Sequence, residues 1–160
     1  MTLFGFGYDV HRMVLGRPCI LGGVQIPFDW GPEGHSDGDA LVHAVIDALL
    51  GAAAEGDIGR RYPDTDPQWK GADSLDLLAD TAAFLRQKGF VPQNIDVTLV
   101  MQRPKIFPYA KEMVCRLAAA AGISPQRVNV KGKTEEGLGF TGEEKGIAAY
   151  AVCSVRKEDV

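Results

Sequence analysis

The chain has 160 residues, of which 46% are hydrophobic and 24% charged, and a formal net charge of −4. This length predicts one domain over residues 1–160, with a core that needs no disulfide or metal to hold it together. No run of about 18 apolar residues occurs, so we expect no membrane-spanning segment and no membrane partner. The acidic balance and the lack of a Lys/Arg cluster exclude a typical nucleic-acid-binding protein. Local charges or bound metal ions would have to attract any anionic ligand.

The N-terminus and the cysteines indicate the cell compartment. No basic segment followed by an apolar run begins the chain, so we expect no signal peptide. The three cysteines, Cys19, Cys115 and Cys153, are odd in number, show no paired spacing and stand among apolar residues. We therefore expect reduced, buried thiols and a cytoplasmic location.

The first half of the chain predicts a strand, a hairpin and a helix, in that order. Residues 2–11 form the strand, and residues 18–28 form a hairpin that turns at Gly22 and Gly23. Residues 29–39 have the composition of a loop. Apolar residues at helical spacing predict a helix over 40–54, with Asp39 as a favoured N-cap residue. Residues 55–73 carry many Gly and Pro and predict a long loop, and such loops are usually functional or disordered.

The second half predicts two further helices and three strands. One helix starts near Ser74 and ends at Gly89, and the other covers 108–121 and ends at Gly122. The strands are predicted over 94–102, 127–133 and 146–155, with a loop over 134–145. Together these elements predict an α+β fold, a small mixed β-sheet with helices packed on one face.

The last strand carries apolar residues on both faces. Ile147 and Ala149 belong to one face, and Tyr150 and Val152 belong to the other. Three helices can cover only one side of a small sheet, and large apolar patches are uncommon on the surface of monomers. We therefore expect the other face to be buried against further copies of the chain in a homo-oligomer.

A metal site is predicted where the first strand meets the first helix. Asp9 and His11 stand two residues apart, so on a strand they point to the same face, about 6.5–7 Å apart. His43 lies on the helix, and Asp47, one turn later, could orient its ring. One carboxylate and two imidazoles suit a zinc ion that keeps a fourth position open for substrate or water. Each residue alone could equally be a polar side chain with ordinary hydrogen-bond partners and no metal. The prediction therefore rests on the three residues together.

Four loops carry further groups that can bind anions or cations. Residues 34–39 place His35 and Ser36 just before a helix N-terminus, where backbone N–H groups suit anions. Residues 56–67 hold three acids, which a solvated turn would also explain. Arg103 and Lys105 follow a strand, and residues 131–142 set Lys133, Thr134 and Glu136 among glycines; the lysine and threonine can donate to phosphate oxygens, and the glutamate suits Mg²⁺. No Walker loop or dinucleotide fingerprint occurs.

Five segments, in this order, resemble one enzyme family. They read DVH, HSDGDALVHAVIDALLGAAAEGDIG, PDTDPQWKGADS, QRPK and GLGFTG. The chain resembles the 2-C-methyl-D-erythritol 2,4-cyclodiphosphate synthases of the non-mevalonate isoprenoid pathway over nearly its whole length. The resemblance implies a homotrimer with active sites between adjacent subunits, and zinc at Asp9, His11 and His43. It also implies a Mg²⁺ or Mn²⁺ ion, which Glu136 binds together with the substrate diphosphate.

The same resemblance implies the reaction and the residues that take part. In 4-diphosphocytidyl-2-C-methyl-D-erythritol 2-phosphate, the 2-phosphate attacks the β-phosphorus, closes a cyclic diphosphate and expels CMP. His35 and Thr134 are implied to be catalytic, because they would stabilise the transition state. Residues implied to contact substrate are Asp9, His11, His35 and Ser36; Asp57, Ile58, Gly59, Tyr62, Pro63, Asp64, Thr65 and Asp66; Met101, Gln102, Arg103, Pro104, Lys105, Ile106 and Phe107, around the cytidine; and Lys133, Thr134, Glu135, Glu136 and Phe140.

Two positions depart from the family pattern. Lys133 stands where relatives often have a hydroxyl residue, a change that still suits phosphate. Glu143 stands where relatives usually have an arginine beside a cavity on the threefold axis. Since a carboxylate there repels anions, we expect no isoprenoid diphosphate to bind in that cavity.

Two other classes of function are compatible with the same residues. A zinc-dependent phosphoester hydrolase would use water at the open metal position and release inorganic phosphate. A non-catalytic anion- or nucleotide-binding module would use the metal only for structure. Product analysis separates these alternatives from a CMP-releasing cyclase.

Overall fold

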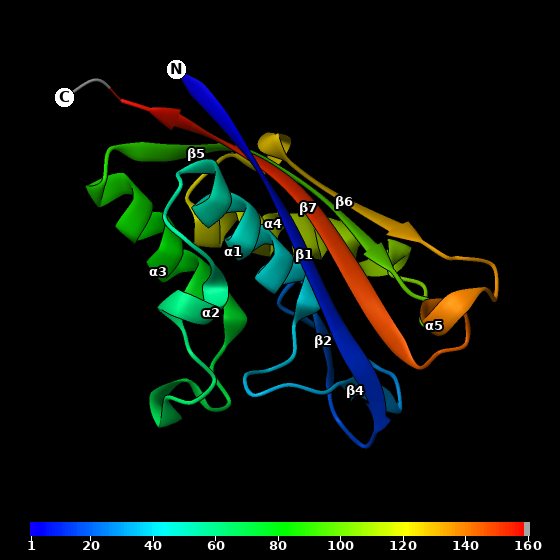
Figure 1. Ribbon diagram of the computed structural model, residues 1–160. Helices are drawn as coiled ribbons and strands as arrows, with labels where there is room; N and C mark the ends of the chain where they lie inside the picture. Colours follow the sequence, from blue (N-terminus) through cyan, green and yellow to red (C-terminus); the bar gives the residue numbers. More distant parts are fainter. Residues whose placement is uncertain (159–160) are drawn as a thin grey trace.

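The computed structural model describes residues 1–158, and its centre is a five-stranded sheet with the order β4-β1-β7-β5-β6 (Figure 1). Strands β5 and β6 pair in parallel and the other neighbours are antiparallel, so the sheet is mixed, as predicted. A separate hairpin, β2 with β3, matches the prediction for residues 18–28. The strand bounds are β1 Thr2–Leu15, β2 Cys19–Leu21, β3 Val24–Ile26, β4 Trp30–Pro32, β5 Phe90–Val100, β6 Val128–Lys133 and β7 Gly146–Lys157.

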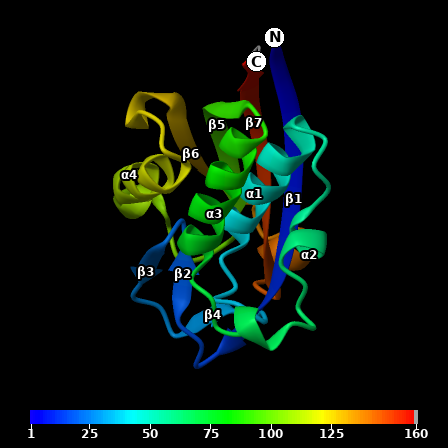
Figure 2. The ribbon, with the colours of Figure 1, turned by 90° about the vertical axis from the view of Figure 1, so that its left-hand side faces the viewer.

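The helices gather on one face of the sheet, which confirms the predicted layer arrangement (Figures 1 and 2). Helix α1 lies directly on strands β1 and β7, and α3 packs between α1 and α4. No helix among residues 1–158 is long and apolar enough to cross a membrane. The helix bounds are α1 Ala40–Ala52, α2 Ile58–Arg61, α3 Ser74–Gln87, α4 Ala110–Ala121 and α5 Gly139–Gly142.

Helix α1 is buried on nearly all sides because it lies between the sheet and α3. Asp39 caps its N-terminus, as predicted, by accepting a hydrogen bond from the Val42 N–H. The same carboxylate accepts the N–H groups of Gly22 and Gly23 at the hairpin turn. One buried side chain thus ties the start of α1 to the β2–β3 hairpin.

Two glycines of β1 let α1 approach the strand closely. A Cβ atom built on Gly5 would lie 2.0 Å from the Ala48 carbonyl oxygen, and one built on Gly7 would lie 1.9 Å from the Ala44 oxygen. Ala44 follows His43, and Gly7 stands two residues before Asp9. This backbone contact therefore sets the distance between the strand and the helix that carry the predicted metal ligands.

Replacing Gly7 by alanine is expected to destabilise the protein by about 3 kcal/mol, because the helix must move away from the strand. The same shift should weaken metal binding. Urea unfolding and metal titration measure the two effects. Gly51→Ala is the matched control, since the nearest neighbouring atom to its added Cβ lies 3.9 Å away, and alanine in a helix interior should be neutral or slightly stabilising. Equal stability of the two variants would contradict the prediction.

The main differences from the predicted strand and loop boundaries occur at four places, and smaller ones at the ends of β5, at Val100, and of β7, at Lys157. Strand β1 continues to Leu15 because its last residues pair with β4. Strand β4 itself lies inside the segment 29–39, which was predicted to be a loop. Strand β5 starts at Phe90 rather than at residue 94, since a register shift between Pro92 and Asn94 interrupts the pattern. The predicted structureless loops 55–73 and 134–145 contain the single-turn helices α2 and α5. Helices of one turn are too short to show helical periodicity in a sequence.

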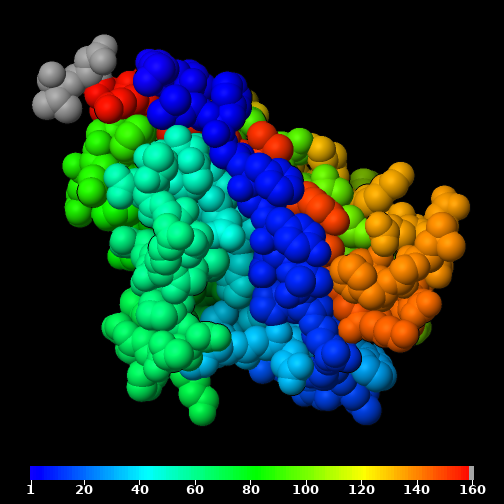
Figure 3. Space-filling view, in the orientation of Figure 1, coloured from blue at the N-terminus to red at the C-terminus, as the bar shows by residue number. Residues whose placement is uncertain are grey.

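The sheet face opposite the helices is uncovered in the single chain, so only one face of β7 is fully buried. Phe4 and Phe6 are 72% and 62% exposed, and Figure 3 shows β1 and part of β7 at the surface. The rings of Tyr8 and Tyr150 lie 5.1 Å apart on this face. We call the exposed apolar side chains of this face the aromatic face; they are Phe4, Phe6, Tyr8, Val10, Tyr150 and Val152.

The cysteines carry free thiols, as predicted. Cys19 and Cys153 are buried, whereas Cys115 is exposed on α4, so the prediction of burial is wrong for Cys115. Burial raises the pKa of Cys19 to about 11 and raises that of Cys153 further, which makes both thiols unreactive.

Candidate active site

Asp9, His11 and His43 converge at the contact between β1 and α1. The Asp9 Oδ2 atom lies 2.7 Å from His11 Nε2 and 3.1 Å from His43 Nδ1. The two ring nitrogens lie 3.3 Å apart. Strand alternation brings Asp9 and His11 to one face, and the first turns of α1 bring His43 beside them. The three groups can hold a metal ion, as predicted.

The hydrogen bonds behind the two imidazoles leave their facing nitrogens free to coordinate. His11 Nδ1 donates to the Glu33 carbonyl oxygen, and His43 Nε2 lies 2.8 Å from the Ser74 hydroxyl. In the neutral rings, the lone pairs of His11 Nε2 and His43 Nδ1 therefore face the Asp9 carboxylate. Three acceptors this close repel one another unless protons or a metal ion lie among them, and one carboxylate with two imidazoles is a donor set that zinc accepts.

The protonation of the cluster agrees with this geometry. Burial raises the pKa of Asp9, but hydrogen bonds with His11 and His43 outweigh burial and lower it to about 2. Burial lowers the pKa of His11, and the Asp9 carboxylate outweighs burial and raises it. The carboxylate is therefore ionised at neutral pH, and it attracts positive charge to the point where the three side chains meet.

Asp47 does not orient His43, which corrects the prediction made from their one-turn spacing. Its Oδ1 atom accepts the backbone N–H of Ile58 at 2.7 Å, at the start of α2. The ring of His43 instead contacts the Ser74 and Ser36 hydroxyl groups, at 2.8 and 3.1 Å. Nothing in the sequence marked Ser74 as more than a helix start.

A cavity of about 420 Å³ is lined by two of the three candidate ligands, His11 and His43. We call it the metal-side cavity. It brings together segments 34–36 and 58–64, which the sequence placed in separate loops, and adds two residues that sequence reasoning missed, Trp69 and Leu77. The predicted site residues in its lining are His11, His35, Ser36, His43, Ile58, Gly59, Tyr62 and Asp64.

Two acids of this region serve as helix caps. Asp57 accepts the Arg60 N–H at the start of α2, and Asp66 accepts the Gln68 N–H in the next turn. The His35 Nε2 atom lies 3.4 Å from the Asp66 carbonyl oxygen. Pro63 and Thr65 stand in the same 62–66 turn segment beside the cavity. The capping bonds order the backbone of this segment and leave Asp64 in the cavity wall.

A second cavity of about 180 Å³ unites the other two predicted segments. We call it the loop cavity. It lies where the chain leaves β5 and β6, because parallel neighbours end at the same edge of a sheet. The first segment was expected to bind an anion or a base through Arg103 and Lys105, and the second to bind phosphate through Lys133 and Thr134. The predicted site residues in its lining are Met101, Pro104, Lys105, Ile106, Phe107, Lys133 and Thr134.

The remaining predicted residues lie in the loops that follow β5 and β6, and Gln102, Arg103 and Glu135 form hydrogen bonds or ion pairs there. Arg103 forms a bidentate ion pair with Glu144, and Gln102 Oε1 accepts the Gly137 N–H at 3.3 Å. Glu135 accepts the Thr141 hydroxyl at 2.6 Å. Glu136 is exposed and adopts a φ of 52°. Phe140 is 42% exposed on α5, and Glu143 pairs with Lys145 at 2.7 Å.

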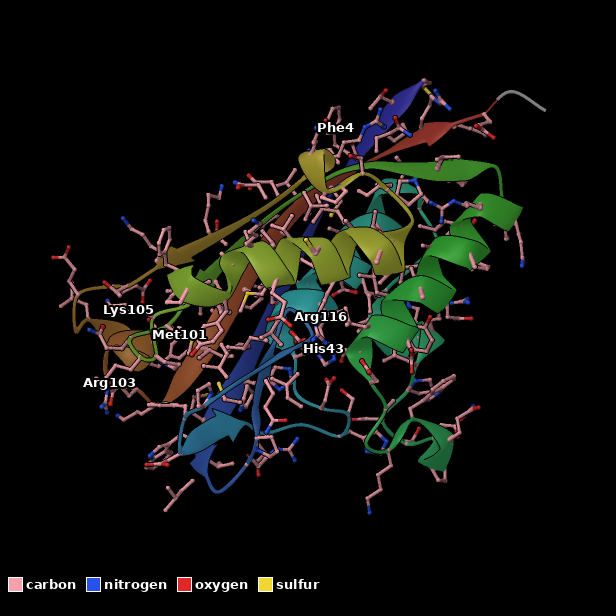
Figure 4. The ribbon with its side chains drawn as sticks, turned by 180° about the vertical axis from the view of Figure 1, so that it is seen from behind. Phe4, His43, Met101, Arg103, Lys105 and Arg116 are labelled. Carbon is pink, nitrogen blue, oxygen red and sulfur yellow. The ribbon has the colours of Figure 1, made fainter. Side chains whose placement is uncertain are left out.

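The two cavities are separate within the described chain. No residue lines both of them. Figure 4 shows Met101, Arg103 and Lys105 together on one side of the molecule, away from His43. One chain therefore carries both predicted halves of a site but does not join them.

A mixed α+β fold that places an Asp-His-His cluster beside a cavity defines this protein as one with a candidate metal-binding site. The chain belongs to the YgbB family, whose model matches residues 2–156.

Named relatives agree with this assignment. A 2-C-methyl-D-erythritol 2,4-cyclodiphosphate synthase from Symbiobacterium thermophilum is 56% identical over 96% of this chain and 98% of its own length. The bifunctional IspDF structure from Campylobacter jejuni superposes with a TM-score of 0.95 at 40% identity, over 99% of this chain and 43% of that one. The Plasmodium falciparum IspF–CDP complex gives 0.86 at 30% identity, over 99% and 97%.

Proposed function

We propose that the protein converts 4-diphosphocytidyl-2-C-methyl-D-erythritol 2-phosphate to 2-C-methyl-D-erythritol 2,4-cyclodiphosphate and CMP, as a single-domain cytoplasmic enzyme. The observation that carries the proposal is the Asp9, His11 and His43 cluster, whose two histidines line the metal-side cavity. The name of the 56% identical relative supports the same reaction. Three free thiols agree with a reducing compartment.

The proposed reaction needs charge neutralisation more than proton transfer. The 2-phosphate oxygen forms a bond to the β-phosphorus, the bond from that phosphorus to the bridging oxygen breaks, and CMP leaves with the electron pair. Both the nucleophile and the leaving group are anions, so alignment and opposite charge lower the barrier. A Zn²⁺ ion at the cluster and a Mg²⁺ or Mn²⁺ ion at Glu136 would supply positive charge to the diphosphate when bound.

The chain's own residues bind and align the substrate. His35 and Ser36 stand beside the metal ligands in the cavity wall and would contact the phosphates. Tyr62 and the backbone from Ile58 would enclose the erythritol. Lys105 and Lys133 in the loop cavity supply positive charge for the nucleotide diphosphate, and Thr134 donates a hydroxyl hydrogen to it. The related Plasmodium falciparum protein forms a complex with CDP, which supports a cytidine-binding role for this second cavity.

We further propose that a complete active site forms between subunits of a homotrimer. Each chain separates the metal-side cavity from the loop cavity, so a neighbouring copy must supply the other half. The aromatic face offers an apolar surface for assembly, with Phe4 and Phe6 mostly exposed. Closed cyclic symmetry would join one half-site of each chain to the complementary half-site of the next, and repeat this at every interface.

Product analysis on the diphosphocytidyl substrate tests the function. We expect stoichiometric CMP and a cyclic diphosphate, release that depends on divalent metal, and no inorganic phosphate. Free phosphate would indicate the hydrolase instead. Binding of CDP without turnover, in protein loaded with zinc and magnesium, would indicate a non-catalytic module and overturn the proposal.

A further inference from the structure

We propose that Ser74 and Asp37 are positioning residues that fix the ring of His43 for metal binding, an inference that rests on the metal site of the proposed function. His43 Nε2 lies 2.8 Å from the Ser74 Oγ atom. The Ser74 hydroxyl in turn donates to Asp37 Oδ1. The three groups form a chain from imidazole to hydroxyl to carboxylate, directed away from the metal site.

The direction of the hydrogen bonds in this chain follows from the groups themselves. An ionised carboxylate can only accept, so the single hydroxyl proton of Ser74 is used toward Asp37. The Ser74 oxygen is then free to accept, and His43 Nε2 must carry a proton to donate to it. The other ring nitrogen, Nδ1, is the atom 3.1 Å from Asp9 Oδ2, and its lone pair is available to a metal ion that replaces the proton shared with Asp9. The chain therefore selects the tautomer that can bind a metal.

The surrounding backbone holds both partners in place. Asp37 Oδ2 accepts the Ser74 N–H at 2.9 Å at the start of α3, and Asp37 Oδ1 accepts the Asp39 N–H at 3.1 Å. Ser74 is fully buried. The loop before α1 is thus fastened to the first residue of α3, and His43 meets Ser74 where the two helices begin. Because both the N–H and the hydroxyl of Ser74 are bonded to Asp37, the hydroxyl oxygen has a fixed position from which to hold the His43 ring.

Ser36 offers a comparison within the same site. Its hydroxyl also approaches His43 Nε2, at 3.1 Å. Among residues 1–158, however, the Ser36 hydroxyl has no carboxylate partner, so the direction of its proton is not fixed. We therefore assign the positioning role to the Ser74 and Asp37 pair and give Ser36 none in selecting the tautomer.

Zinc affinity of the full chain, measured by competition with a chromogenic chelator, tests the inference. Ser74→Ala is expected to weaken zinc binding about 10- to 100-fold, the usual effect of removing a partner behind a ligand histidine. Asp37→Asn, which keeps the volume of the side chain, should act in the same direction. Ser36→Ala should stay within about threefold of the unsubstituted protein.

Asp73→Ala is the matched control for stability. Asp73 caps the same helix by accepting the Leu75 N–H, and it has no hydrogen bond to His43. We expect its thermal unfolding to resemble that of Ser74→Ala while its zinc affinity stays unchanged. If both variants lost zinc affinity equally, the effect would be one of helix stability, and the inference would be wrong.

Nitrogen-15 NMR of the metal-free protein gives an independent readout. The His43 ring should carry its proton on Nε2, and Ser74→Ala should lose this preference. Zinc affinity in folded Ser74→Ala within threefold of the unsubstituted protein would overturn the inference. If Ser74→Ala does not fold, an unchanged affinity in Asp37→Asn would do the same. Failure of the unsubstituted protein to bind zinc would instead refute the metal site of the proposed function.

Discussion

Replacing His43 by alanine is expected to lower kcat/KM for CMP release by at least about 1000-fold, a loss of about 4 kcal/mol of transition-state stabilisation. The substitution removes the Nδ1 ligand and leaves two groups, Asp9 and His11, to hold the ion. A carboxylate pKa of about 2 for Asp9 shows how strongly that carboxylate interacts with the two rings around it. We expect the purified variant to contain little zinc, measured by elemental analysis, alongside the loss of turnover.

A control on the same helix separates loss of metal from loss of fold. Gly51→Ala adds a methyl group whose nearest atom outside the adjoining helix backbone, the Phe6 carbonyl oxygen, lies 3.9 Å away, so zinc content and activity should stay unchanged. Far-UV circular dichroism of metal-free His43→Ala should match that of metal-free unsubstituted protein. A folded His43→Ala variant that retains activity within tenfold would mean that this metal site does not carry the reaction.

Mixing two inactive variants is expected to restore about a quarter of full activity, if each site is built from two chains. His43→Ala damages the metal-side cavity, and Thr134→Ala damages the loop cavity. In trimers assembled randomly from equal amounts, each site draws its two halves independently, so about one site in four is intact. The measurement is CMP release after joint refolding, compared with each variant refolded alone.

The outcome depends on where the halves of the site come from. If both halves belonged to one chain, every chain would carry one lesion and no activity would return. Mixing the two assembled proteins without refolding controls for subunit exchange and should give no recovery. A stable monomer by light scattering, with full activity, would contradict both the trimer and the shared site.

Much of the fold could be predicted because its main elements show clear periodicity. Helix α1 and the strand that holds Asp9 and His11 were visible in the sequence, since helical and strand spacing determine which side chains share a face. Helices α2 and α5 were missed, because single turns show no period. The extension of β1 to Leu15 depends on pairing with β4, a partner that no local pattern reveals.

The candidate metal ligands could likewise be predicted, whereas the residues that surround them could not. The residue order alone predicts which side chains could bind a metal, because Asp9 and His11 at strand spacing must point the same way. The contact of Ser74, rather than Asp47, with His43 is visible only in the folded chain, since helix α3 meets α1 there and the Asp47 carboxylate accepts the Ile58 N–H. Contacts between distant segments depend on packing, as in the approach of α1 to Gly7, and such packing is a property of the folded chain as a whole.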